Sequence, residues 1–289
     1  IRKATSGRPG PVYVEIPIDI MFGLIAQEDV RHLDPAGTPS RPAPTGESVE
    51  RIVQLLRGAK RPVILAGGGT LYAGCAGQLR SFAERWSIPV LTNAKSRGLL
   101  PTDRPLWARG YAPLAPARGQ GLVPDLLLAL GARFGIYTGG RRKSFLPPEA
   151  TIVQVDIEPG EMGRIREPDL SVTADCAELL GALLKATEGE SSCGDAEWAR
   201  RLCAVGTASK QHFAEVAAVR SGPVHPYRLA LAVAGALPRE GVVCLDGGES
   251  HSWIDMTAHT DAPGRWLGHG YVGCMGEGLP LAVGAQVAN

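Results

Sequence analysis

The sequence predicts an α/β protein: a doubly wound, mostly parallel sheet forms a central domain, and an incomplete second α/β domain follows it. Three observations predict this. Short apolar runs alternate with helical patterns between residues 47 and 185, which is typical of parallel strands buried on both faces. The length of 289 residues is enough for about two domains. The 37 glycines and 23 prolines supply many tight turns.

The composition excludes several classes of protein. Hydrophobic residues make up 44% and charged residues 20%, which is ordinary for a globular protein and excludes a disordered chain. The net charge of +1 offers no field for nucleic acid or an anionic membrane. No apolar run approaches the roughly 20 residues of a membrane span, and no secretion signal is present. We therefore expect a cytoplasmic protein that binds neither nucleic acid nor membrane.

The cysteines predict neither a metal site nor disulfides. None of the six is in C-x-x-C spacing, and no histidines are grouped with them. We expect free, mostly buried thiols in a reducing compartment.

The N-terminal part predicts one strand and a linker. Residues 11–17 alternate apolar and polar side chains between prolines, as a strand does. Its sheet partners would have to come from another chain or from residues before Ile1. Residues 28–46 contain four prolines and predict a linker over a surface.

The regular part begins near residue 47. Ser48 is predicted to cap a helix that ends at Leu56, and further helices are predicted over 75–86 and 176–185. Strands are predicted at 61–66, 88–92, 125–131, 151–156 and 170–174.

The C-terminal part opens a further α/β unit that is not completed. A linker at 187–194 precedes a long helix over 196–220. A helix at 227–237 and a strand at 241–246 follow, and the last helix is predicted within 276–289.

Two strand ends in the central part could bind an anion. Gly67, Gly68 and Gly69 lie between a strand and a helix, where backbone N–H groups can bind a phosphate. The alternative is that these glycines only form a turn and bind no ligand, as most glycine-rich turns do. Arg133 follows another strand and could hold a carboxylate or phosphate, or could instead pair with Asp156. The basic residues 141–143 are either a solvated loop or a further phosphate contact.

Two glycine-rich loops in the C-terminal part form a second candidate anion site. Residues 246–250 (Asp-Gly-Gly-Glu-Ser) follow a strand, and residues 268–278 enter a helix. The alternative is two tight turns with a buried Met275. The histidines are scattered, and there is no G-x-S-x-G, H-E-x-x-H or Walker motif, so no catalytic residue is predicted.

Five stretches carry a resemblance to a known family. They are residues 10–19 (GPVYVEIPID), 59–69 (AKRPVILAGGG), 130–135 (LGARFG), 153–159 (VQVDIEP) and 270–276 (GYVGCMG). In this order, over almost the whole chain, they resemble the thiamine-diphosphate enzymes of the acetolactate synthase superfamily. Residues 130–139 and 268–276 look most like benzaldehyde lyase and 2-hydroxyacyl-CoA lyase.

The resemblance implies three domains and a partial chain. It assigns 1–20 to the end of a pyrimidine-binding domain, 21–44 to a linker and 45–190 to a Rossmann-like central domain. It assigns 191–221 to a linker and helix, and 222–289 to the opening of the diphosphate-binding domain. The family's activating glutamate and its Gly-Asp-Gly…Asn-Asn magnesium motif have no counterpart here. We therefore expect this chain alone to be inactive, to bind thiamine diphosphate and magnesium negligibly, and to hold no metal.

The resemblance also implies site residues, which carry over position by position. Asp246, Gly247, Gly248, Glu249 and Ser250 match the loop that contacts the diphosphate of thiamine diphosphate. The loop under the cofactor is matched by Gly273, Cys274 and Met275, the last being the large apolar side chain that holds the cofactor bent.

A departure from the family pattern argues against FAD. Flavin-containing acetolactate synthases carry aspartates after Ala-Arg-Phe, and this chain reads Gly135-Ile-Tyr-Thr there. A nucleotide such as CoA or ADP is a possible ligand of Gly67, Gly68, Gly69 and Arg133.

The implied function is a carboligase or C–C lyase acting on 2-keto acids, 2-hydroxy ketones or 2-hydroxyacyl-CoA in the full-length, magnesium-dependent enzyme. The implied partners are a small carbonyl substrate and further copies of the same chain in a dimer or tetramer. Two alternatives stay open: an acetolactate synthase that uses pyruvate, and a non-catalytic nucleotide-binding or regulatory module.

Overall fold

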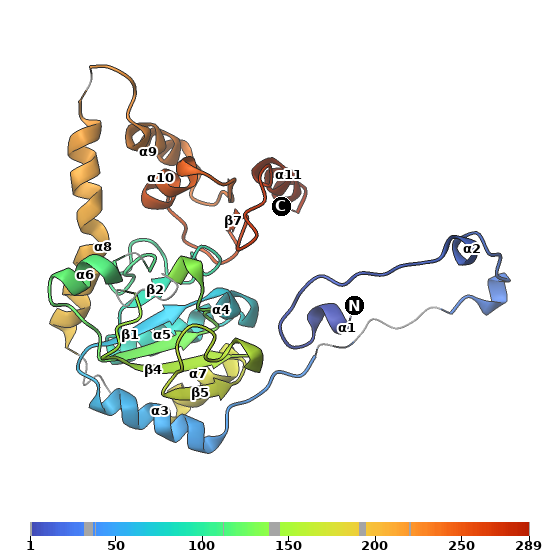
Figure 1. Ribbon diagram of the computed structural model, residues 1–289, viewed down its shortest axis with the longest axis horizontal. Helices are drawn as coiled ribbons and strands as arrows, with labels where there is room; N and C mark the ends of the chain where they lie inside the picture. Colours follow the sequence, from blue (N-terminus) through green and yellow to red (C-terminus); the bar gives the residue numbers. More distant parts are fainter. Residues whose placement is uncertain are drawn as a thin grey trace.

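A five-stranded parallel sheet forms the centre of the molecule in the computed structural model, which describes residues 2–31, 37, 39–111, 113–138, 145–190, 195–219 and 221–288. The strand order is β2-β1-β3-β4-β5. The predicted doubly wound α/β fold is confirmed (Figure 1). The strands are β1 (Pro62–Ala66), β2 (Val90–Thr92), β3 (Leu126–Leu130), β4 (Thr151–Asp156) and β5 (Leu170–Thr173).

The central strands are apolar at successive positions because both faces of the sheet are covered. Every residue of β1, β2 and β3 is buried. Side chains alternate between the two faces, so Ile64 and Leu128 enter one core while Val63 and Leu127 enter the other.

Helices cover both faces. On one side lie α3 (Gly46–Gly58), α5 (Ala76–Trp86) and α7 (Cys176–Ala186), whose apolar side chains, Phe82 among them, form the larger core. On the other side α8 (Ala196–Ala217) contributes Trp198, whose Nε1 donates to the Pro62 carbonyl at 2.8 Å, and α6 (Leu114–Gly119) contributes Leu114.

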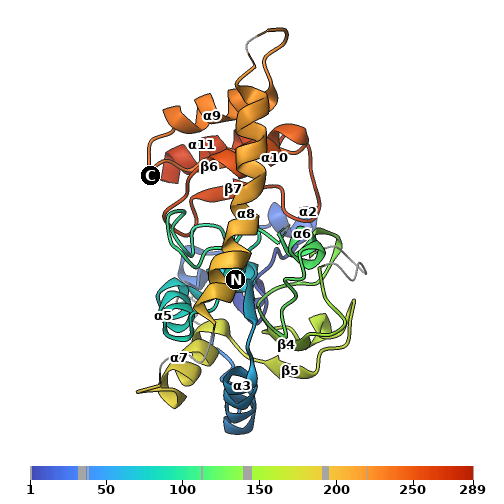
Figure 2. The same cartoon turned by 90° about the vertical axis from the view of Figure 1, so that its left-hand side faces the viewer.

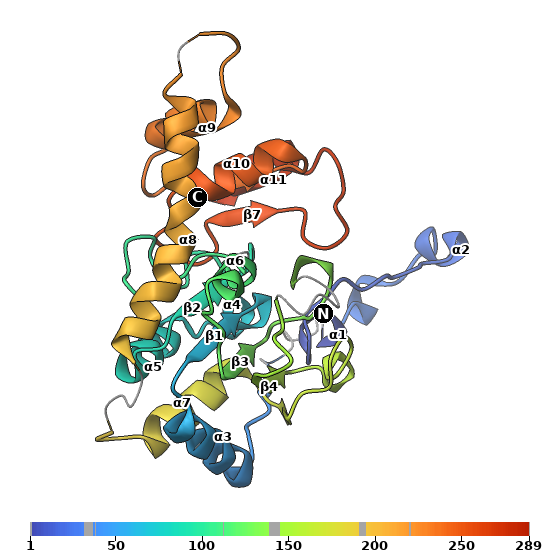
Figure 3. The same ribbon diagram turned by 60° about the vertical axis from the view of Figure 1, so that its left-hand side comes forward.

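A smaller second sheet lies beyond the carboxyl ends of the central strands. It pairs β6 (Val243–Leu245) with β7 (Trp266–Gly268) in parallel. Figures 2 and 3 show α8 rising from the central sheet toward α9, beside the second sheet. The helices of this unit are α9 (Pro226–Ala236), α10 (Glu249–Thr257) and α11 (Gly278–Ala288). The predicted domain boundaries themselves stay predictions.

Short helices complete the chain. They are α1 (Arg2–Thr5), α2 (Ile18–Met21) and α4 (Gly68–Ala73), with 3₁₀ turns η1 (Gln27–Asp29), η2 (Ile136–Thr138) and η3 (Pro159–Glu161).

Residues 11–17, predicted as a strand that needs a partner from outside this segment, form no strand in the described structure. These residues join no described sheet and are exposed, in an arm that reaches away from the body to α2 (Figure 1). An alternating pattern makes a strand only when a neighbouring strand accepts its hydrogen bonds. That another segment supplies this partner stays a prediction.

Three smaller predictions are also corrected or limited. The first central helix is capped by Thr45, whose Oγ1 accepts from the Ser48 N–H at 3.2 Å, and not by Ser48. All five described cysteines are free, as predicted, but only Cys75 and Cys176 are buried. The prediction that most of the thiols are buried is therefore wrong for the described cysteines. Cys193 lies outside the described residues. Burial raises the pKa of Cys75 to about 12. Within the described ranges, no helix is both long and apolar enough to cross a membrane.

Candidate functional site

Asp246 joins the two glycine-rich loops of the C-terminal unit. Its Oδ1 accepts from the N–H groups of Gly247 at 2.8 Å and Gly276 at 3.1 Å, and its Oδ2 accepts from Gly278 at 3.2 Å. These hydrogen bonds hold the pKa of Asp246 below its usual value. The predicted pairing of the two loops is thus present, and one carboxylate at the end of β6 makes it.

The first of these loops ends in a helix N-terminus that is open to an anion. Gly248 precedes α10 with φ +84°, and no side chain caps the first turn of the helix. The backbone N–H groups at Glu249 and Ser250 therefore belong to the part of the helix that carries partial positive charge. Gly278 allows the second loop to lie against the backbone of Asp246. A Cβ on residue 278 would lie 3.0 Å from the Asp246 nitrogen, which is closer than most Cβ contacts.

The second loop presents its predicted cofactor residues at the surface. Gly273 has φ +68°, which favours glycine, and Cys274 is exposed. A hydrogen bond with Glu277, followed by burial, raises the pKa of Cys274. Met275 is 94% exposed, so the buried Met275 that the alternative interpretation expects is not found.

The glycines at 67–69 serve the packing of two strand ends. The sheet order changes direction between β1 and β3, so the turns after these strands lie at the switch point where open sheets bind ligands. A Cβ on Gly67 would lie 2.1 Å from the Gly131 carbonyl oxygen. The N–H of Gly67 donates to Leu130 at 2.9 Å and that of Gly69 to Gly131 at 3.1 Å, so two of the three amides are engaged.

Arg133 lies at the same strand ends. One of its two predicted roles was an ion pair with Asp156, and the structure does not show that pair among the described residues. The Nε of Arg133 lies 3.3 Å from Oε2 of Glu161. Its guanidinium lies over the ring of Tyr271, 5.1 Å from the ring centroid. The structure thus links Arg133 to the 268–278 loop rather than to Gly67. Residues 141–143, the predicted basic loop, lie outside the described residues.

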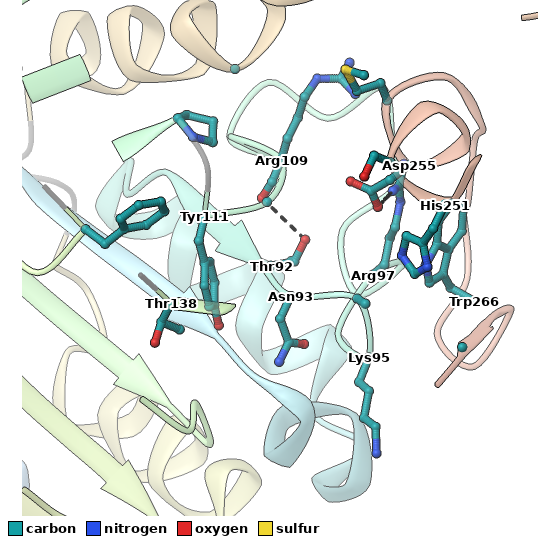
Figure 4. A pocket seen from close by; sticks show the side chains of 18 of the residues that line it. Thr92, Asn93, Lys95, Arg97, Arg109, Tyr111, Thr138, His251, Asp255 and Trp266 are labelled. Atoms are coloured by element: carbon teal, nitrogen blue, oxygen red, sulfur yellow. Dashed lines mark hydrogen bonds and ion pairs between the residues drawn. The ribbon is translucent and has the colours of Figure 1, made fainter. Parts of the chain in front are cut away.

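A cavity of about 970 Å³ lies between the loops after the central strands and the second unit (Figure 4). Its size is that of a small-molecule site. Three cationic side chains line it, Lys95, Arg97 and Arg109, together with His251 and Asp255 from α10. The cavity is therefore suited to a ligand that carries negative charge.

Two arginines give this cavity a fixed wall. Arg97 is 4% exposed, pairs with Asp255, donates through Nη2 to the Ala258 carbonyl at 3.0 Å and lies 3.8 Å from the Trp266 ring centroid. Arg109 adopts φ +70°, which is uncommon outside glycine, and its Nε is buried without a hydrogen-bond partner in the described part of the chain. Burial lowers the pKa of both guanidinium groups.

Sequence reasoning missed this cavity. Lys95, Arg97 and Arg109 belong to no glycine-rich or catalytic motif, and Arg97 reaches Asp255 only because the two units pack together. One local signal was present: Asn93 directly follows β2, and polar residues just after a strand lie at the ligand-binding edge.

The loops fit the diphosphate end of a thiamine cofactor. The open start of α10 and the approach of Gly278 to Asp246 leave a cradle built of backbone N–H groups. Magnesium requires oxygen ligands. Asp246 already accepts three backbone hydrogen bonds, and in the described ranges no three His, Cys, Asp or Glu side chains are grouped to hold an ion.

Comparison with known proteins gives matches over both units. Residues 49–183 match the family described as thiamine pyrophosphate enzyme, central domain, and residues 246–289 match thiamine pyrophosphate enzyme, C-terminal TPP binding domain.

Similar proteins cover the chain end to end. The chain is 31% identical over 291 residues to acetolactate synthase isozyme 1 large subunit of Escherichia coli, with 100% of the chain and 50% of that protein covered. It is 32% identical over 294 residues to acetolactate synthase 1, chloroplastic, of Zea mays, with 99% and 45% covered. It is 30% identical over 298 residues to a probable acetolactate synthase large subunit of Methanocaldococcus jannaschii, with 99% and 49% covered.

The chain spans about half the length of the curated relatives it matches. The parallel sheet with α5 and α6 lies within the first matched region, and Asp246 with both glycine-rich loops lies within the second. Residues 49–183 are thus similar to the central domain of thiamine pyrophosphate enzymes, and residues 246–289 are similar to part of their C-terminal TPP-binding domain.

Proposed function

We propose that these residues are part of a thiamine-diphosphate-dependent enzyme that makes or breaks a carbon–carbon bond beside a carbonyl group. The observation that carries the proposal is the junction at Asp246, which brings residues 246–250 and 268–278 together next to an uncapped helix. Substrates would be 2-keto acids, 2-hydroxy ketones or 2-hydroxyacyl-CoA.

Among these reactions, the names of the relatives favour acetolactate synthesis from pyruvate. The relatives in Escherichia coli, Zea mays and Methanocaldococcus jannaschii are all named acetolactate synthases. The lyase reading depends on the motif likeness of residues 130–139 and 268–276 alone. We therefore propose carboligation of pyruvate first and cleavage of a 2-hydroxy ketone or 2-hydroxyacyl-CoA second.

Each side chain has a defined task in the proposed site. When bound, thiamine diphosphate supplies a carbon nucleophile and an electron sink. The backbone N–H groups at Gly248, Glu249 and Ser250 would hold its diphosphate, and Asp246 keeps the two loops in register. Met275, exposed on the second loop, would pack against the cofactor and fix its conformation. Magnesium is proposed for the complete enzyme, with ligands outside the described residues, and the lack of FAD stays a prediction.

The proposal is tested by expressing the complete reading frame that encodes these residues. We expect calorimetric titration to show magnesium-dependent binding of thiamine diphosphate, and pyruvate to be converted to acetolactate. Benzoin or a 2-hydroxyacyl-CoA should be cleaved more slowly. The complete protein failing to bind thiamine diphosphate would refute the proposal, and cleavage faster than carboligation would reverse its order.

A second candidate function is binding of a nucleotide such as ADP or CoA by the central part. The specific observation is the Arg109 Nε, buried at the cavity without a partner in the described part of the chain. Leaving such a group unpaired costs free energy, which an anionic ligand would recover. We expect ADP or CoA to bind the 289-residue chain, and Arg109→Met to abolish binding. Arg118→Met, which changes a half-buried arginine that does not line the cavity, should leave binding unchanged. Equal binding by both variants would reject this candidate.

The proposed partners are further copies of the same chain. Large apolar side chains are exposed along the N-terminal arm, and burying them between copies would be favourable. Assembly into a dimer or tetramer is thus part of the proposal.

A further inference from the structure

Among the residues that the structure describes, Glu161 is the carboxylate with the most arginine partners. It is 5% exposed and lies at the end of η3. Its Oε1 lies 2.5 Å from Nη1 of Arg8, and its Oε2 lies 2.9 Å from Nη1 of Arg164 and 3.3 Å from Nε of Arg133. The three arginines come from the N-terminal segment, from the same turn and from the end of β3.

The turn that carries Glu161 is itself fixed. The buried side chain of Gln154, on β4, donates to the Glu161 carbonyl at 3.0 Å and accepts from the Gly163 N–H at 3.3 Å. Burial acts to raise the pKa of Glu161, and the hydrogen bond from Arg164 with the charges of the three arginines lowers it below its usual value. Glu161 is therefore a rigid anion at neutral pH.

One of the three arginines, Arg133, also contacts the second unit. Besides lying over the Tyr271 ring, Arg133 offers its carbonyl to the Tyr271 hydroxyl at 3.4 Å. Burial raises the pKa of Tyr271, so the hydroxyl stays protonated and can donate. The ring lies beside the backbone at Gly135, where a Cβ would be in ordinary van der Waals contact with Cε1 of Tyr271 at 3.8 Å.

Tyr271 lies in the same loop as Gly273, Cys274 and Met275 and close to Gly276, which bonds to Asp246. The loop is thus held at two points, by Asp246 from its own unit and by Arg133 from the central domain. Without the second contact, a loop with positive φ at Gly270, Gly273 and Gly276 would have few restraints on its conformation.

We propose that Glu161 is a positioning residue for the 268–278 loop: it fixes the guanidinium of Arg133, and Arg133 in turn holds Tyr271 and the cofactor residues that follow it. The link to the cofactor depends on the proposed function. Because Arg8 pairs with the same carboxylate, the arrangement also connects the N-terminal segment to this loop.

Hydrogen exchange of the 289-residue chain tests the proposal without any cofactor. In Glu161→Gln and in Tyr271→Ala, the backbone N–H groups of residues 270–277 should exchange about five- to thirtyfold faster than in the unmodified chain. The double variant should exchange no faster than Tyr271→Ala alone, since both changes break one chain of contacts. Glu149→Gln, which removes the exposed pair with Arg118, is the matched control and should leave the loop unchanged.

Tyr271→Ala keeps the proposal falsifiable if Glu161→Gln fails to fold, because Tyr271 is 39% exposed and lies outside the cores. Unchanged loop exchange in Tyr271→Ala, or additive effects in the double variant, would overturn the positioning role. Faster exchange in a protein that binds no thiamine diphosphate would keep the positioning role and reject only its link to the cofactor.

Discussion

Replacing Gly67 with alanine is expected to cost most of the stability of the central domain. The new Cβ would lie 2.1 Å from the Gly131 carbonyl oxygen and 2.4 Å from the Ala132 Cα. Both obstacles are backbone atoms at the end of β3, so no side-chain rotation relieves the overlap. The strand ends would have to move apart, and backbone shifts in a packed region are costly.

The expected loss is at least about 4 kcal/mol of the free energy of unfolding, out of about 5–15 kcal/mol for a typical domain. Urea unfolding followed by tryptophan fluorescence measures it, because Trp86 and Trp198 lie in the two cores of this domain.

Gly68→Ala is the matched control one residue along the chain. A Cβ there would meet only the Lys95 side chain, 3.4 Å from its Cδ, and Gly68 begins α4. Alanine is favoured over glycine in a helix by about 0.5–1 kcal/mol, so this variant should be as stable as the unmodified chain or slightly more so. Equal unfolding midpoints for Gly67→Ala and Gly68→Ala would show that the two turns are not packed as described.

The pattern of the central sheet could be predicted from the sequence because burial on both faces leaves a local signature. The strand from Thr151 to Asp156 was predicted with the correct bounds, because it is buried at nearly every position and its sequence is therefore mostly apolar. The run at 11–17 has an equally clear alternation but forms no strand here, because strand formation depends on a neighbour that the local sequence does not encode.

The candidate site divides in the same way. The two glycine-rich loops could be predicted from the sequence because a backbone with positive φ favours glycine, as at Gly248. The contacts of Arg97 with Asp255 and of Arg133 with Glu161 and Tyr271 span distant parts of the chain. A charged residue in a loop gives no sign of its distant partner, so pairing Arg133 with Asp156 was a reasonable expectation that the fold did not fulfil.

Replacing Met275 with alanine is expected to lower turnover of the complete enzyme and to leave the stability of the 289-residue chain unchanged. Met275 is 94% exposed in this chain, so it is not part of a core. Surface substitutions of this kind change the free energy of unfolding by less than about 0.5 kcal/mol. The unfolding midpoint of the 289-residue chain should therefore be the same for Met275→Ala as for the unmodified chain.

Turnover should respond differently if Met275 packs against bound thiamine diphosphate. Burying a methionine side chain contributes about 1.5–3 kcal/mol, and each 1.4 kcal/mol realised in the reactive geometry is tenfold in rate. The expected loss is therefore about ten- to hundredfold in turnover. Affinity for thiamine diphosphate should fall less, because the loop at 246–250 and the magnesium ion would still hold the diphosphate. Met275→Leu, which keeps an apolar side chain of similar volume, should retain most of the turnover. Unchanged turnover in a folded Met275→Ala enzyme would remove Met275 from the cofactor and would weaken the placement of Gly273 and Cys274 beside it.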